Sequence, residues 1–362
     1  MIQDSPRRIA ILGTGLIGGS IGLAIQRRHP EVDVVGFDPS SAQRAVQRGA
    51  CTEAAGTLEE AVVNADIIVL ATPVGTLPDL LRDASALASP TALLTDAGSV
   101  KGPLADAAGQ LDLADRFVGG HPMAGAEQGG IEHADALLFE NAVYVLCPLS
   151  GHTVHPHALW LVDAVGARPV VVDATRHDHL VATISHLPQL IAVALVETAA
   201  ELGEDALALA AGGFRDMTRI ASSPFGLWGD IYGANADAVQ SALDRFMDQL
   251  SEHRQHVARQ PDALRPSFEL AARHRGVIPS DARGFLAPLT DVMVWTADYP
   301  GALHAITTTL AEADVDVKDI ELMRIREGDA GTFRLGFVDA ETADRAVDAF
   351  TEQGIRAQRR DV

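Results

Sequence analysis

The sequence predicts an α/β protein in which a doubly wound parallel sheet is followed by an all-helical domain and a small C-terminal domain. Three observations predict this class. Short apolar runs alternate with helix-like segments up to about residue 173, strand signals vanish between about 175 and 274, and strand signals return after 283. We therefore expect domains at residues 1–173, 174–283 and 284–362.

The first domain is expected to begin as a strand, a glycine turn and a helix. The apolar run Arg7–Leu12 leads into GTGLIGGS at Gly13–Ser20, and helix-like sequence continues to about Arg28. Further buried-strand patterns follow, with helical segments between most of them. They are Val32–Phe37, Ile67–Ala71, Ala92–Thr95, Phe117–Gly119, Tyr144–Cys147 and Pro169–Val172. Strands that alternate with helices favour a parallel, Rossmann-type sheet.

The second domain is predicted to be helical, with long Ala- and Leu-rich periodicity. Its segment Leu180–Leu202 is apolar on more than one face, as in a helix buried within a bundle or at a subunit interface. We expect a homodimer. The polar stretch Pro261–Arg283 is expected to be a linker with room for an extra helix.

The last segment has the pattern of a βαββαβ domain. Strand-like Thr290–Thr296 leads through Asp298-Tyr-Pro-Gly301 into a helix, and two strands, a second helix and a final strand are expected after it. This order and the Asp-x-Pro-Gly turn resemble the ACT domain, a module that binds amino acids at subunit interfaces. The resemblance implies regulation by an aromatic amino acid, with tyrosine, phenylalanine and tryptophan all open.

Composition excludes several classes of function. A net charge of −21 argues against a nucleic-acid partner, which requires clustered Lys and Arg. The two cysteines, Cys51 and Cys147, lie far apart, and no apolar run reaches the roughly 20 residues of a membrane span. We expect a soluble, cytoplasmic protein with no membrane partner.

The glycine turn predicts a dinucleotide site. Gly13 suits the tight turn, Gly15 allows close approach of a pyrophosphate, and Gly18 allows helix and strand to pack. The first helical turn, with Leu16 and Ile17, would supply N–H donors to the phosphates.

An acidic residue completes the cofactor pattern. Asp38 lies 20 residues after Gly18 at the end of the second strand, where a carboxylate binds the ribose diol and repels a 2′-phosphate. NAD is therefore expected rather than NADP. Thr72 and Pro73 are expected beside the cofactor because they follow another strand.

Five motifs in order strongly resemble prephenate and arogenate dehydrogenases. They are GTGLIGGS at Gly13–Ser20, DAGSVK at Asp96–Lys101, GGHPMAGAE at Gly119–Glu127, SHLPQL at Ser185–Leu190 and GGFRDMTRIASSPFGLW at Gly212–Trp228. The resemblance spans both first domains. It implies an NAD-dependent oxidative decarboxylation of prephenate to 4-hydroxyphenylpyruvate on the way to tyrosine, or of arogenate directly to tyrosine.

The resemblance implies a role for each candidate site residue. It makes His121 the catalytic histidine that accepts the hydroxyl proton, and Ser99 the serine that orients the reacting groups. Arg219 would bind a substrate carboxylate. His186 would contact the substrate side chain, and a wall and an entrance of the pocket are assigned to Trp228 and Glu127, respectively. Lys101 could hold its loop, attract the anionic substrate or lie on the surface.

Three alternatives remain at this point. A hydroxyacid-type dehydrogenase is disfavoured because SHLPQL carries no lysine where those enzymes have one. A non-catalytic NAD and amino-acid sensor is disfavoured by the joint presence of Ser99, His121 and Arg219. A metal site is not expected: several histidines lie two residues apart, but in stretches interpreted as polar loops without suitable partners. Those histidines are His152, His155, His157, His177 and His179.

Overall fold

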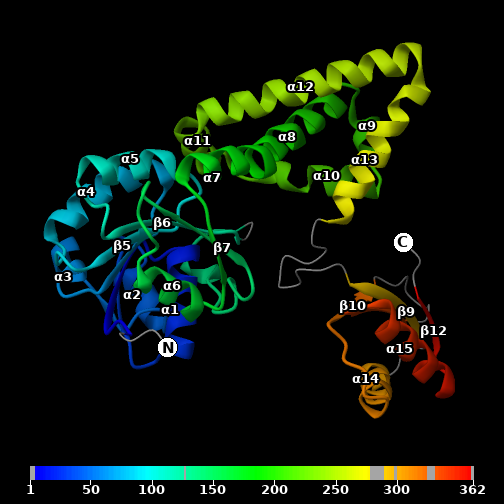
Figure 1. Cartoon of the computed structure of the whole chain (residues 1–362), viewed down its shortest axis with the longest axis horizontal. Helices are drawn as coiled ribbons and strands as arrows, with labels where there is room; N and C mark the ends of the chain where they lie inside the picture. The colour runs from blue at the N-terminus through cyan, green and yellow to red at the C-terminus, as the bar shows by residue number, and fades with distance from the viewer. Residues whose placement is uncertain (1–4, 126–127, 278–288, 297–299, 324–330, 360–362) are drawn as a thin grey trace. The chain divides into compact units, whose positions relative to one another are not determined.

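The computed structural model describes residues 5–125, 128–277, 289–296, 300–323 and 331–359 (Figure 1). The chain divides into two compact units, Met1–Ala258 and Arg259–Val362. Each unit is described by itself.

The first unit is built on an eight-stranded sheet in the order β3-β2-β1-β4-β5-β6-β7-β8. Strand β1 lies between β2 and β4, parallel to both, so the connections leave it in opposite directions. The strands are β1 (Arg8–Leu12), β2 (Asp33–Phe37), β3 (Glu53–Ala54), β4 (Ile67–Leu70), β5 (Leu93–Asp96), β6 (Phe117–Pro122), β7 (Val143–Pro148) and β8 (Arg168–Val171). The change of direction at β1 and β4 creates the crevice in which such sheets bind ligands.

Two features of this sheet differ from the sequence-based expectation. Strand β7 runs antiparallel to β6, so the sheet is not parallel throughout. The described part of the β6–β7 connection holds only a short 3-10 helix, η2 (Ile131–His133), and no crossover helix of the kind that usually joins parallel strands. Strand β3 was not predicted, because two residues are too few for a periodicity signal.

Helices cover both faces of the sheet, and alternate strand residues point into two separate cores. On one face, Ile9 and Ile11 pack in a cluster with residues of α1 (Leu16–Arg28) and α6 (Pro156–Ala164). On the other, Ala10 and Leu12 pack with three further helices. Those helices are α3 (Leu58–Val62), α4 (Leu77–Leu87) and α5 (Gly102–Gln110). Because both faces of the central strands β1, β4 and β5 are buried, these strands are nearly continuous apolar runs.

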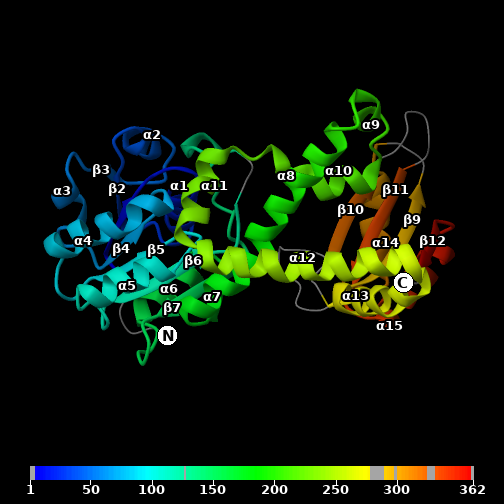
Figure 2. The same cartoon turned by 90° about the horizontal axis from the view of Figure 1, so that it is seen from above.

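The helices that follow the sheet carry much of the predicted site. They are α7 (Ala174–Val181), η3 (Ala182–His186), α8 (Leu187–Ala200), α9 (Glu204–Ala208), α10 (Gly212–Thr218), η4 (Arg219–Ser222), α11 (Phe225–Ala234) and α12 (Ala236–Arg259) (Figure 2). Turn η3 is π-helical: the N–H of Leu187 bonds to the carbonyl of Ala182, five residues earlier. Turns of this kind are rare and often occur at functional sites.

The run Ala174–Ala200 is the one described helical stretch long and apolar enough, by length and composition, to cross a membrane. Core helices of soluble proteins pass the same test. This run contains His177, Asp178 and His186, all buried and hydrogen-bonded within the first unit. In the most apolar window of this run 33% is buried, so burial within the first unit accounts for part of its apolar character.

The second unit contains the predicted βαββαβ order after two helical segments. The segments are η5 (Pro261–Leu264) and α13 (Arg265–Gly276), then β9 (Thr290–Thr296), α14 (Ala302–Glu312), β10 (Asp319–Met323), β11 (Gly331–Phe337), α15 (Ala340–Glu352) and β12 (Arg356–Arg359). The four strands are antiparallel in the order β10-β11-β9-β12. This is the ACT-like topology, and α13 is the extra helix for which the expected linker left room.

A buried ion pair holds the loop between β5 and α5 in the first unit. The ammonium of Lys101, 1% exposed, bonds to the carboxylate of Asp96 and lies 2.7 Å from the carbonyl oxygen of Gly120. The other carboxylate oxygen of Asp96 accepts the N–H of Gly120 at 3.0 Å. The surface alternative for Lys101 is therefore wrong: this lysine holds its loop against β6.

We predict that Lys101→Met lowers the free energy of unfolding of the first unit by about 3–5 kcal/mol, because it leaves the Asp96 carboxylate buried and unpaired. Arg82→Met is the matched control, since Arg82 pairs with Asp79 on the exposed surface of the same unit. That change is expected to cost less than about 1 kcal/mol. Urea unfolding followed by circular dichroism measures both, and equal losses would contradict the role given to Lys101.

Candidate active site

The glycine turn after β1 has the geometry of a phosphate cradle. Gly13 has a φ of +98°, and a Cβ there would lie 2.6 Å from the carbonyl oxygen of Ala71. A Cβ on Gly18 would lie 2.0 Å from the carbonyl oxygen of Gly13, so only glycine lets α1 pack this closely on β1. A Cβ on Gly15 would meet no described atom within 4 Å. The space over Gly15 is thus open to a ligand.

The N-terminus of α1 faces the same turn. Gly15 is its N-cap residue, and no side chain caps this helix end in the described structure. Leu16 and Ile17, half-buried, form the first helical turn. The free N–H groups of a first turn and the positive end of the helix dipole together attract a phosphate. These residues fit the pyrophosphate of a dinucleotide.

Asp38 directly follows β2 and is fixed by its neighbours. One carboxylate oxygen accepts the N–H groups of Ser40 and Ser41, at 2.8 and 2.9 Å, and the other accepts the N–H of Thr14 at 3.1 Å. Partial burial raises the pKa of Asp38, but these bonds outweigh it and lower the pKa overall. The side chain therefore remains a carboxylate beside the glycine turn, where it favours a ribose diol over a 2′-phosphate.

Thr72 and Pro73 follow β4, across the crevice from the glycine turn. The methyl carbon of Thr72 lies 2.9 Å from the position that a Cβ on Gly13 would take, so Thr72 lines this turn. Its hydroxyl accepts a hydrogen bond from Thr76 at 2.9 Å. Pro73 is exposed at the start of η1 (Val74–Thr76). Both residues lie at the edge where the sequence placed them.

His121 lies near the carboxyl end of β6 and begins a chain of hydrogen bonds. Its Nδ1 lies 2.8 Å from Nε2 of His177, and Nδ1 of His177 lies 2.7 Å from the carboxylate of Asp178. Burial lowers the pKa of His121 well below 6.5, and the nearby Lys101 ammonium, His177 and His186 lower it further. His121 is therefore neutral near pH 7 and able to accept a proton.

His186 is connected to Asp178, and so to His177 and His121, through Asn235. It is 1% exposed at the end of η3, and its Nδ1 lies 3.3 Å from the amide nitrogen of Asn235. That nitrogen also donates to the backbone carbonyl of Asp178 at 2.9 Å, which fixes the orientation of the amide. Burial lowers the pKa of His186 to about 4, so it is neutral near pH 7. Its Nδ1 must accept, and its Nε2 therefore carries the proton.

The positions of Ser99 and Arg219 follow from contacts made by residues near them in the sequence. Half-buried Ser99 lies two residues before Lys101, whose ammonium bonds to Gly120, the residue before His121. Arg219 is exposed at the start of η4, and the next residue, Ile220, accepts a hydrogen bond at 3.0 Å from Gln189 of α8.

Trp228 borders His186. Their ring centroids lie 6.1 Å apart in an edge-to-face arrangement, and Trp228 stacks on Tyr232 at 5.6 Å. The indole N–H of Trp228 is buried and has no hydrogen-bond partner among the described atoms. Trp228 therefore packs against His186. Glu127, expected at the entrance, lies outside the described residues.

Several residues of this group escaped the sequence analysis. His177 was interpreted with other histidines as part of a polar loop, but His177 and His179 lie in α7, and His157 lies in α6. Asp178 was not singled out. Asn235 carried no motif. The available signal was the His-Asp pair in a helix that begins directly after the last predicted strand of the first domain.

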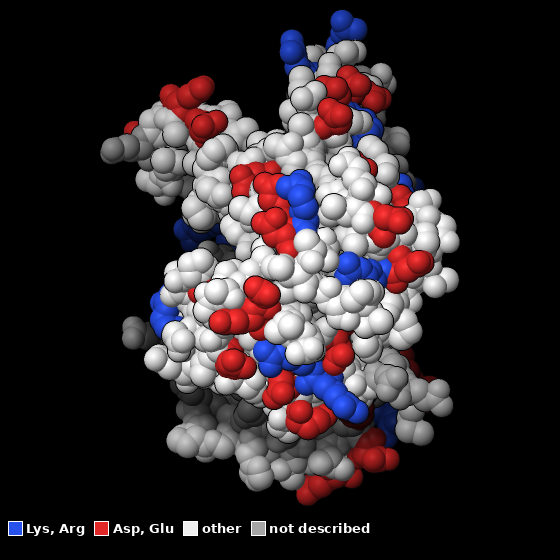
Figure 3. All heavy atoms as spheres, turned by 90° about the vertical axis from the view of Figure 1, so that its left-hand side faces the viewer, with Lys and Arg blue, Asp and Glu red and all other residues white. Residues whose placement is uncertain are grey.

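The negative charge of the chain affects how an anionic substrate could be attracted. Figure 3 shows acidic and basic side chains intermixed on one face of the molecule. With a net charge of −21 on the chain, attraction of an anionic substrate depends on individual cations at the site.

Comparison with known families gives matches over most of the chain. The family described as "Prephenate dehydrogenase, nucleotide-binding domain" matches residues 21–170, and "Prephenate dehydrogenase, dimerization domain" matches residues 173–269. The prephenate dehydrogenase of Bacillus subtilis (strain 168) is 34% identical over 360 residues, which cover 95% of this chain and 96% of the relative.

Solved structures give the same result. Prephenate dehydrogenase from Aquifex aeolicus, in complex with hydroxyphenyl propionate and NAD+, is 30% identical with a TM-score of 0.69, covering 75% of this chain and 98% of that one. Arogenate dehydrogenase from Synechocystis is also 30% identical, with a TM-score of 0.66, and covers 74% of this chain and 98% of its own. The chain therefore belongs to the prephenate dehydrogenase family.

Proposed function

We propose that this protein is an NAD-dependent prephenate dehydrogenase that converts prephenate to 4-hydroxyphenylpyruvate and carbon dioxide. The observation that carries the proposal is the neutral His121, held at the carboxyl edge of the sheet on which the glycine turn and Asp38 form a dinucleotide cradle. The family rules out the hydroxyacid-type rival, and a non-catalytic sensor would need no base at this edge.

The proposed reaction needs a base that first accepts a proton and then returns it. The ring carbon that bears the hydroxyl loses a hydride, and the C–C bond to the ring carboxylate breaks to release carbon dioxide, with its electron pair completing the aromatic ring. His121 accepts the hydroxyl proton as the hydride leaves and returns it to the phenolate oxygen, so the step releases no net proton. When bound, NAD supplies the hydride acceptor.

The other residues would orient the substrate. We assign Ser99 to a hydrogen bond with the reacting hydroxyl or with His121, and Arg219 to a charge-assisted contact with a substrate carboxylate. Trp228 would pack against the substrate and offer its unpartnered indole N–H. Glu127 is retained as a residue of the entrance on the family resemblance alone. Gly13, Gly15, Leu16, Ile17, Gly18, Asp38, Thr72 and Pro73 would hold NAD.

The tautomer of His186 supports prephenate over arogenate. A neutral imidazole with its proton on Nε2 donates to a keto or carboxylate oxygen, whereas the ammonium of arogenate needs an acceptor. Arogenate remains the second candidate, because a solved relative of similar identity is an arogenate dehydrogenase.

We further propose a homodimer regulated by an aromatic amino acid. Large apolar side chains are exposed in the segment that matches the dimerization domain, among them Leu202, Leu209 and Phe225 at 80%, 84% and 76%. In the second unit, a cavity of about 270 Å³ is lined by Trp295, with the guanidinium of Arg356 4.6 Å from its ring. An aromatic ring and a cation suit an aromatic amino acid. Both cysteines are buried and unpaired, which supports the reducing cytoplasm as location.

The deciding experiment is NADH formation from NAD with prephenate and, in parallel, arogenate. We expect turnover of prephenate with a higher kcat/KM than arogenate, no useful turnover with NADP, and inhibition by tyrosine or another aromatic amino acid. Turnover of arogenate alone would make the second candidate correct. Binding of NAD without turnover of either compound would leave the sensor.

Arg219→Ala is expected to raise the KM for prephenate about tenfold or more, with a smaller effect on kcat, because a charge-assisted contact to a carboxylate is lost. Arg215→Ala is the matched control: Arg215 lies one helical turn earlier, is exposed, and donates to the carbonyl of Ala210. Its KM should remain near wild type. Equal changes in both variants would remove Arg219 from the substrate site.

The dependence of kcat/KM on pH tests His121. Because its pKa lies well below 6.5, His121 remains unprotonated down to that pH, so kcat/KM should be level from about pH 8 to 6.5 and fall only at lower pH. His121→Asn should lower kcat at least about a hundredfold while the Kd for NAD stays near wild type. An acid limb centred at or above pH 7 would contradict the neutral-base assignment.

A further inference from the structure

The hydrogen bonds behind His121 determine which of its two nitrogens is free. We propose that His177 and Asp178 are positioning residues that fix His121 as the Nδ1–H tautomer and so leave Nε2 as the proton acceptor. The inference rests on the proposed function, in which His121 is the base, and extends it to two residues with no assigned role.

The donors and acceptors in this series of hydrogen bonds are determined at Asp178. One oxygen of this carboxylate accepts the N–H of Lys101 at 2.8 Å and faces Nδ1 of His177 at 2.7 Å. The other oxygen accepts the N–H of Gly102 at 2.7 Å. Backbone N–H groups donate only, so both oxygens act as acceptors. Nδ1 of His177 must therefore carry a hydrogen and donate it.

The same rule determines which nitrogen of His121 carries its hydrogen. A neutral imidazole has one donor and one acceptor nitrogen, so His177 with its hydrogen on Nδ1 presents a lone pair at Nε2. The atom facing that lone pair at 2.8 Å is Nδ1 of His121, which must donate. The lone pair of His121 is then at Nε2, the nitrogen that can meet the substrate hydroxyl. A histidine of the other tautomer would offer a donor there and accept nothing.

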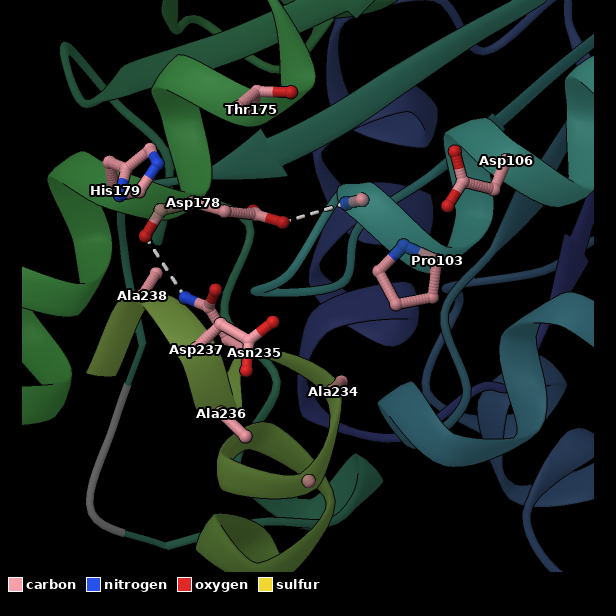
Figure 4. Close-up of a pocket in the computed structure, with 12 residues that line it drawn as sticks. Pro103, Asp106, Thr175, Asp178, His179, Ala234, Asn235, Ala236, Asp237 and Ala238 are labelled. Carbon is pink, nitrogen blue, oxygen red and sulfur yellow. Dashed lines mark hydrogen bonds between the residues drawn. The ribbon is translucent and has the colours of Figure 1, made fainter. Parts of the chain in front are cut away.

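Asp178 is held firmly enough for this role. Figure 4 shows its carboxylate directed at the N-terminus of α5, with a dashed bond, while its backbone carbonyl accepts from Asn235. The nine-residue helix α5 presents its positive end there, and the side chain of Asp178 is only 10% exposed. A cavity of about 410 Å³ lies on this side of α7, bordered by Asp178 and His179. Solvent can reach this cavity, whereas His177 is 2% exposed.

Asn235 connects the two histidines of the site. Its amide donates to the carbonyl of Asp178 and to Nδ1 of His186, and the second bond fixes His186 as the Nε2–H tautomer. The site thus contains two neutral histidines of opposite tautomer: His121 accepts at Nε2, and His186 donates there. A base and a hydrogen-bond donor can then operate at the same pH without any change in charge.

The first test reads the tautomer directly in the resting protein. Histidine labelled with 15N in the ring gives well-separated signals for protonated and unprotonated nitrogens in magic-angle-spinning NMR, and the spectrum of His121→Asn assigns the His121 pair. We expect His121 to be protonated at Nδ1 and unprotonated at Nε2 near pH 7. The opposite pattern would overturn the proposal. The reading needs no substrate, so it stands even if prephenate is not turned over.

The second test removes Nε2 of His177, the atom that accepts the hydrogen bond from Nδ1 of His121. His177→Leu should leave His121 as a mixture of tautomers and lower kcat about ten- to a hundredfold, with the KM for prephenate and the Kd for NAD within about twofold of wild type. His177→Gln, whose amide oxygen can accept from Nδ1, should recover most of the lost kcat. His179→Leu is the matched control, because His179 is exposed on the same helix and does not belong to the hydrogen bonds that connect Asp178, His177 and His121. This change should leave kcat unchanged.

The variants separate positioning from simple support of the fold. Loss of kcat in His177→Leu without a change in the His121 tautomer would mean that His177 only packs there, and would overturn the proposal. An unchanged kcat would do the same. If circular dichroism shows that His177→Leu does not fold, the NMR spectrum of the wild type and the kinetics of His177→Gln still test the proposal. A folded His177→Gln that keeps the Nδ1–H tautomer of His121 but has a kcat below a tenth of wild type would count against it.

Discussion

The first unit depends on one carboxylate. Asp178 lies in α7, yet it bonds to the backbone at the start of α5, to His177 within its own helix, and through its carbonyl to Asn235 at the end of α11. A loop of the nucleotide-binding sheet and two of the helices that follow it are therefore fixed against a single residue. Since backbone donors surround the carboxylate, its burial is compensated, and its loss would release the start of α5 and His177. The bond from Asn235 is made to the backbone carbonyl of Asp178 and does not depend on this side chain.

The buried pair of Asp96 and Lys101 has a related role at the edge of the sheet. It joins the loop after β5 to Gly120 of β6, directly beside His121. The cost of burying two charges is met by their mutual attraction and by the backbone bonds around them. The ammonium also disfavours a second positive charge nearby, which is one reason why His121 stays neutral. One interaction thus serves both the packing of the loop and the chemistry of the base.

Most of the fold could be predicted from the sequence, because the signals were local. The central strands of the first sheet are buried on both faces and appear as continuous apolar runs. Gly13 and Gly18 are required because any side chain would make contacts of 2.6 and 2.0 Å there. The antiparallel β7 could not be predicted in this way, since strand direction depends on the path of a connection. The extra helix α13 lies where only a polar linker with room for a helix was expected.

The site was predictable only in part, for the same physical reason. His121 and the glycines lie in motifs, so the resemblance located them, and their assigned roles remain proposals. His177, Asp178 and Asn235 act through partners 49 to 77 residues away along the chain. Apart from the adjacency of His177 and Asp178 in one helix, nothing local distinguishes these residues from surface polar groups. Only their burial and their hydrogen bonds, which depend on how α5, α7 and α11 come together, identify them.

The π-helical turn η3 has a consequence for the angular placement of side chains. His177 and His186 are nine residues apart, and at about 100° per residue a regular α-helix would direct them to opposite sides. The turn accommodates one surplus residue, so the effective spacing is eight and the two directions differ by only about 80°. A helical wheel drawn through 174–200 without this correction would assign His186, Gln189 and every later position to the wrong face, and an alignment guided by helical periodicity would carry the same one-residue error.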